Sequence, residues 1–162
     1  MAVAGSKVDR LRPEPIEKRV DHLLEECRMV VPGVQALFGF QLMAVFNEPF
    51  FTRLTFGERA LHLGALVLAA LSLACLMAPA AYHRQAEPNH VSPRFVRYAG
   101  TMLMVAMAPL TLAIIADVYV IARMVLEERA LAAATAAGVM TVYLALWFVW
   151  PSVQRRGSGS RR

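Results

Sequence analysis

Residues 60–81 read ALHLGALVLAALSLACLMAPAA, a run of 22 residues interrupted only by the polar side chains of His62 and Ser72. The hydrocarbon core of a bilayer is about 30 Å thick, and a helix that rises about 1.5 Å per residue crosses it in about 20 residues. Apolar and polar residues do not alternate along the run, and Ala and Leu dominate it, so a helix is favoured over a barrel strand. This stretch therefore predicts a transmembrane helix and decides the class of protein.

Three further apolar runs of similar length occur, one before residues 60–81 and two after them. The composition agrees, because 57% of the 162 residues are hydrophobic and 18% are charged. A soluble domain of this size could not bury so many apolar side chains. We predict an all-α fold, an integral membrane four-helix bundle that occupies residues 16–151. The transmembrane helices are expected at about residues 29–47, 60–82, 96–120 and 130–150.

The charged segment before the first run predicts an amphipathic helix. Apolar side chains recur at steps of three or four from Ile16 to Val30, and charged side chains occupy the other face. We expect this helix at about residues 16–30, either as an interfacial helix in the headgroup layer or as the first part of the first span. Residues 1–15 are expected to form a flexible N-terminus, and residues 152–162 a flexible basic tail.

The Lys and Arg residues lie mostly on one side of the expected bundle. The N-terminal segment, the loop between the second and third runs and the tail together hold 13 of the 17, and the other two loops hold 4. The positive-inside rule then places both termini in the cytoplasm. Aromatic residues at the same interface agree with this orientation, namely Tyr82, Tyr98, Trp147 and Trp150.

The first span carries most of the polar residues that a membrane must accommodate. Arg28 and Gln35 lie seven residues apart, so they share one helix face, and Glu25 lies close to the same line. Gln41 and Glu48 form a second seam about 120° away. Because polar groups are costly in a bilayer, these residues form a candidate intramembrane polar site. They face either a packed neighbour or another copy, and the glutamines either bond between helices or line a path for a solute.

Asp117 in the third run is the acid expected to lie below the membrane surface, and it completes this candidate site. We expect it either to be exposed or to form a salt bridge with Arg53, Arg59 or Arg123. An ion or proton site is the alternative. His62 is isolated in the sequence, near the predicted outer end of its span, and is assigned no role.

Three residues are candidate hinges. Pro32 and Gly33 lie where the amphipathic segment meets the first span, and Pro109 lies inside the third. A proline in a helix lacks the N–H that would bond four residues back, and its ring crowds that carbonyl. We expect bends at these positions; a moving hinge and a fixed elbow remain alternatives.

The sequence contains no common catalytic signature, whether GxSxG, HExxH, a phosphate-binding loop or GxGxxG. His83, Glu87 and His90 share one loop without the spacing of a metal site. We therefore predict no enzymatic activity, no catalytic residue, no metal and no cofactor. Nucleic acid is not an expected partner either, because the arginines flank apolar runs instead of forming a basic stripe with aromatics.

Two motifs resemble those of a bacterial family of small four-span membrane proteins whose function is uncharacterised. One is E-x-x-R-x-x-x-P-G-x-Q-x-L-F, here residues 25–38, and the other is A-P-A-A-Y-H-R, here residues 78–84. The resemblance covers about residues 20–150. It implies a bacterial inner membrane and four helices, and it implies no activity, substrate or site residue.

Two functions are consistent with these features. The first is a non-catalytic membrane adaptor or scaffold, whose N-terminal helix and basic tail hold a protein partner or anionic lipid at the cytoplasmic face. The alternative is an oligomeric channel or transport component, with the polar seam of the first helix lining the path. Both place the chain in the lipid bilayer, and a homo-oligomer fits either of them.

Overall fold

The computed structural model describes residues 15–88 and 91–153. Almost all of the expected flexible N-terminus and basic tail lies outside these residues. Every regular element of the described part is a helix, which confirms the all-α prediction. The helices are α1 (Ile16–Ala44), α2 (Glu48–Thr52), α3 (Phe56–Ala86), α4 (Pro93–Leu126) and α5 (Arg129–Leu144), and the π-helix η2 (Ala145–Val149) continues α5.

Four helices of the described residues are long and apolar enough to cross a membrane, which confirms the predicted number of long apolar helices. They cover Lys18–Ala44, Phe56–Ala86, Pro93–Leu126 and Arg129–Val153. The last three contain the expected segment and extend beyond it, whereas the first was expected to reach about residue 47 and ends at Ala44, because the chain turns there toward α2. The chain is thus built as a multi-pass membrane protein by helix length and composition.

Local signals set the helix boundaries. Thr55 and Glu58 form a capping box at the start of α3, in which each side chain binds the other's backbone N–H. Ser92 accepts a hydrogen bond from the N–H of Phe95 at the start of α4. Glu127 ends α4 in the left-handed conformation, with φ of 57°, and the chain turns there into α5.

The amphipathic segment and the first span form one continuous helix. α1 runs from Ile16 to Ala44 with Pro32 inside it, so the structure favours a continued span over a separate interfacial helix. Pro79 and Pro109 also lie inside helices, in α3 and α4. Motion at Pro32, Gly33 or Pro109 stays a prediction.

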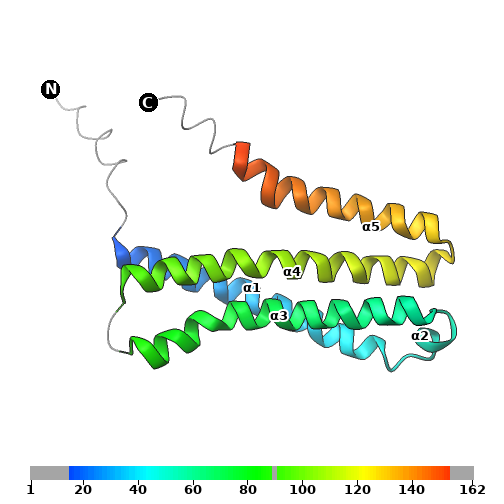
Figure 1. The fold of residues 1–162 in the computed structure, drawn as a ribbon, viewed down its shortest axis with the longest axis horizontal. Helices are drawn as coiled ribbons and strands as arrows, with labels where there is room; N and C mark the ends of the chain where they lie inside the picture. The colour runs from blue at the N-terminus through cyan, green and yellow to red at the C-terminus, as the bar shows by residue number, and fades with distance from the viewer. Residues whose placement is uncertain (1–14, 89–90, 154–162) are drawn as a thin grey trace.

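α3 and α4 form the central pair of the bundle, as Figure 1 shows. α5 packs against α4 and diverges from it toward its C-terminal end, whereas α1 crosses α3 and α4 obliquely. Two names are used below for the ends of the bundle. The α2 end is the one where α1 ends, α3 begins and α4 ends, and the loop end is the opposite one, where the loop between α3 and α4 lies. α2 lies across the α2 end and inserts the ring of Phe50, which is buried.

Small residues bring the helices close together. Ala65 and Ala69 of α3 meet Ala113 of α4, and none of the three has exposed surface. Large apolar side chains point outward instead, as in Phe40, which is 74% exposed. This arrangement suits a bilayer, where close backbone packing joins helices and apolar side chains face lipid.

A polar site joining three helices

The structure divides the six residues of the candidate intramembrane site into two groups. Gln41 and Asp117 are buried and lie together at the α2 end. The other four are exposed and lie on the outer surface of the single chain: Glu25, Arg28, Gln35 and Glu48.

Asp117 is the centre of the buried group. Its Oδ2 accepts a hydrogen bond from Nε2 of Gln41, and its Oδ1 lies 3.0 Å from Nδ1 of His62. Nε2 of His62 lies 3.0 Å from the backbone carbonyl oxygen of Gln41. The three residues therefore close a ring of contacts between α1, α3 and α4, and we call them the polar triad.

The polar triad is shielded from its surroundings. Gln41, His62 and Asp117 are 3%, 5% and 7% exposed. The ring of Phe50 meets the imidazole edge to face, with centroids 5.2 Å apart. At about 1.5 Å per residue, His62 lies about 9 Å along α3 from its first residue. The site is therefore inside a helix that is apolar enough to span the membrane, where polar groups are expensive unless paired.

A buried ion pair lies one turn closer to the α2 end. Nε of Arg123 donates to Oε1 of Glu58 over 2.7 Å, and Oε2 of Glu58 accepts bonds from the N–H and hydroxyl of Thr55. At the surface beyond it, Arg53 and Glu127 form an exposed pair at 3.2 Å. Polar groups thus run from the α2 end down to the triad, along α3 and α4.

The expected partners of Asp117 were wrong. The arginines considered for it bind elsewhere, since Arg123 pairs with Glu58 and Arg53 with Glu127, and Asp117 is buried instead of exposed. Its partner is His62, 55 residues earlier, which the sequence analysis left without a role. The sequence did contain one signal for this pair. The two predicted helices are antiparallel, and both residues lie within three turns of the same end, so they are expected at a similar depth in the membrane.

Three buried side-chain atoms in this region have no hydrogen-bond partner: Oε1 of Gln41, Nε of Arg59 and Nη1 of Arg123. The guanidinium of Arg59 lies over the ring of Phe51, 5.8 Å from its centroid. The free Oε1 leaves the triad with one spare acceptor for a water or another donor. Within residues 15–88 and 91–153, no three His, Cys, Asp or Glu side chains are grouped to hold a metal.

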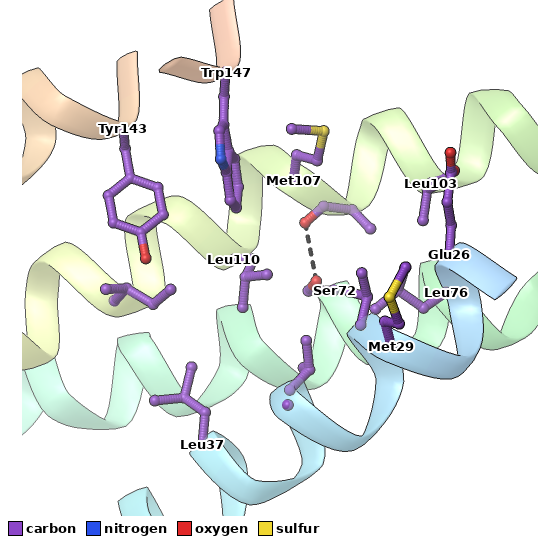
Figure 2. Close-up of a pocket in the computed structure, with 15 residues that line it drawn as sticks. Glu26, Met29, Leu37, Ser72, Leu76, Leu103, Met107, Leu110, Tyr143 and Trp147 are labelled. Carbon is purple, nitrogen blue, oxygen red and sulfur yellow. Dashed lines mark hydrogen bonds between the residues drawn. The ribbon is translucent and has the colours of Figure 1, made fainter. Parts of the chain in front are cut away.

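The other half of the molecule has an apolar groove of about 660 Å³. Figure 2 shows Tyr143 of α5 and Trp147 of η2 pointing into it over α4, while α1 forms the opposite wall. Ser72 of α3 donates to the carbonyl oxygen of Ala106 in its floor, over 2.9 Å. Apart from Glu26 and this serine, apolar and aromatic side chains line the groove, so it offers little chemistry.

A family model matches residues 11–151, and its description is a family of unknown function, DUF6328. The chain belongs to this family, which agrees with the resemblance to an uncharacterised family found in the sequence. No curated protein and no solved structure matches it. Membership assigns no role to any residue, so the functional argument depends on the geometry above.

Proposed function

We propose that the chain is a non-catalytic adaptor or scaffold of the bacterial inner membrane that assembles through the exposed polar seam of α1. The seam consists of Arg28 and Gln35, with Glu25 beside them. The observation that carries the proposal is that this seam is exposed in the single chain, although it belongs to a helix long and apolar enough to span a membrane.

The position of Gln35 supports an assembled state. It lies nine residues before the end of α1, about 14 Å along the helix, so its amide is far from the α2 end. An amide that faces lipid there has no partner, whereas an amide or carbonyl of a second helix would satisfy it. Val34 and Gln41 are the fully buried residues among the described side chains of α1, which leaves most of the helix free for a neighbour.

The proposed orientation puts the loop end in the cytoplasm, since the basic segments flank that end in the sequence. The first part of α1 and the tail would then face anionic lipid or a protein partner at the inner surface. A tag at Arg162 that reacts with an impermeant reagent in intact cells would contradict this orientation.

The proposal is tested by co-purifying two differently tagged copies in mild detergent and by native mass spectrometry. We expect the wild-type copies to associate and Gln35→Leu to lower the associated fraction at least several-fold. Phe40→Leu is the matched control, because it changes an exposed residue of α1 that is outside the seam. A monomeric wild type, or equal loss in the control, would reject assembly through the seam.

An oligomeric transport component is the second candidate, and the polar triad favours it. Ionisable residues inside membrane spans commonly mark the path of an ion or proton. A single four-helix bundle is packed along its axis, so a path would run between copies with their α1 seams turned inward. Ion flux into proteoliposomes that Gln35→Leu alters would favour this candidate over the adaptor, and an absence of flux would reject it.

A further inference from the structure

The two ring nitrogens of His62 both face acceptors. A carbonyl oxygen cannot donate, so the bond between Nε2 and the carbonyl of Gln41 requires a hydrogen on Nε2. In a neutral ring, the hydrogen on Nε2 leaves a lone pair on Nδ1, which lies 3.0 Å from Oδ1 of Asp117. If Asp117 were also ionised, two lone pairs would meet in a buried site and repel.

One additional proton removes this conflict. It sits either on Nδ1, which gives an imidazolium and a carboxylate, or on Oδ1, which gives a neutral ring and a carboxylic acid. Both forms keep the three contacts of the triad, and both leave the pair with no net charge. We propose that His62 and Asp117 form a binding site for a single proton that holds the end of α1 against α3 and α4.

The neighbouring charges are balanced around this proton. On α3 and α4 the nearest ionic groups, Glu58 and Arg123, neutralise each other. Arg59 lies over the ring of Phe51, and on α2 the carboxylate of Glu48 is exposed. The C-terminal end of α1 lies beside the triad, and this negative end of the helix dipole favours a cation. The surroundings therefore favour the proton on the ring, paired with a carboxylate.

The proton is positioned to control the attachment of α1. Gln41 ties α1 to α4 through its amide and to α3 through its carbonyl, and both bonds end on the proton-binding pair. When the proton leaves for water at the α2 end, either Oδ1 meets the lone pair of Nδ1 or Nε2 loses its hydrogen toward the carbonyl. Each outcome breaks one contact of the triad, so the last turns of α1 are released.

Asp117→Asn gives a sharp test, because an asparagine satisfies the triad without the proton. Its Nδ2 donates to Nδ1 of a neutral His62, its Oδ1 accepts from Gln41, and Nε2 of His62 still donates to the carbonyl. The variant should therefore keep α1 attached over the pH range in which the wild type releases it. Glu48→Gln is the control, since it makes the same carboxylate-to-amide change at an exposed residue of the α2 end and leaves the triad and the pair of Glu58 and Arg123 unchanged.

Nitrogen NMR of His62 measures the proton directly. The other three histidines, His22, His83 and His90, are replaced by Gln so that a single ring reports. We expect protons on both nitrogens of His62 in the wild type and a neutral ring with the hydrogen on Nε2 in Asp117→Asn at the same pH. A neutral wild-type ring beside a protonated carboxyl, seen by infrared spectroscopy, also supports the site. A neutral ring beside a carboxylate while α1 stays attached overturns it.

A nitroxide label at residue 46 measures the attachment. Phe46 is 86% exposed just beyond α1, and Val125 of α4, 72% exposed, provides the control position. Both are labelled as cysteines after Cys27 and Cys75 are replaced by Ala. We expect the mobile component at residue 46 to become dominant as rising pH removes the proton, with no change at residue 125. It should stay minor in Asp117→Asn and respond as in the wild type in Glu48→Gln.

Three results would overturn the coupling. The first is a wild-type label at residue 46 that does not change over the pH range in which His62 loses its proton. The second is a ring that keeps both protons until the bundle unfolds, and the third is a response of Asp117→Asn equal to that of the wild type. None of these results depends on assembly through the α1 seam, because the triad lies within one chain.

Discussion

The two ends of the bundle are held together by different interactions. At the α2 end, α1 meets α3 and α4 through the polar triad, beside a buried ion pair. Toward the loop end, an apolar groove separates α1 from α5, and Figure 1 shows α5 diverging there. In a membrane, apolar contact gives little preference between a helix and lipid, whereas a buried polar contact strongly prefers its partner. We therefore expect the α2 end to be the ordered end and the loop end the adaptable one.

The largest loss of stability is expected when one residue of the polar triad is replaced and its partner is left in place. His62→Leu leaves the carboxylate of Asp117 buried without its main partner, and the loss of one member of a buried pair costs about 3–5 kcal/mol. The free energy of unfolding, measured by denaturation with a strong detergent in mixed micelles, should fall by about this amount. The double variant His62→Leu, Asp117→Leu should recover most of it, because no charge is then left unpaired. A double variant that is less stable than the single one would contradict the ion-pair account.

A smaller loss is expected at the neighbouring ion pair. Arg123→Met removes a hydrogen bond to a charged group, which is worth about 1.5–3 kcal/mol. Thr55 still provides two donors to Glu58, so this carboxylate is better compensated than Asp117 is in His62→Leu. Thermal unfolding in detergent should place this variant between His62→Leu and the wild type. The exposed pair provides the comparison, since Arg53→Met should cost under about 1 kcal/mol.

The small-residue contact between α3 and α4 should tolerate no added volume. Ala69→Leu inserts three carbon atoms where Ala69 has no exposed surface, and overpacking of this kind costs about 1–3 kcal/mol. The same change at Ala60, which is exposed on the same helix, should be nearly neutral. Equal effects at the two positions, measured by detergent unfolding, would show that close packing of alanines does not join the central pair.

The smallest effect is expected at the apolar groove. Ser72→Ala removes the hydrogen bond to the carbonyl of Ala106, and single bonds of this kind between membrane helices average about 0.6 kcal/mol. If Ser72→Ala lowered the free energy of unfolding as much as His62→Leu does, the two ends of the bundle would not differ in how strongly they are held. Unfolding free energies of both variants in one detergent mixture would decide this.

The number of spans followed from the sequence because hydropathy sums along a segment, and no knowledge of neighbours is needed. The partner of Asp117 could not be deduced in the same way. Arg53, Arg59 and Arg123 were the expected partners because an arginine carries the charge opposite to that of an aspartate. In the structure, the rotation of α3 and α4 about their axes turns His62 toward Asp117, and none of these arginines. Ala65, Ala69 and Ala113 pack together where these two helices meet, and hydropathy does not encode which helix faces meet.

The polar seam of α1 is a second case in which the sequence does not give the partner of a polar residue. Heptad spacing predicts that Arg28 and Gln35 share one face, since helix geometry fixes the angle between residues seven apart, and both are exposed in α1. Spacing does not say what that face meets. Within the described part of the chain, Arg28 and Gln35 are exposed, whereas Gln41 on the second seam binds residues of two other helices.

The amino-acid sequence by itself determined that this protein is a set of four apolar helices with charged ends, because the transfer of each segment into lipid depends on its own length and side chains. The tertiary structure decided which polar groups are buried together. Three residues from helices far apart in the chain form one hydrogen-bonded triad, because packing alone sets the relative depth and rotation of those helices.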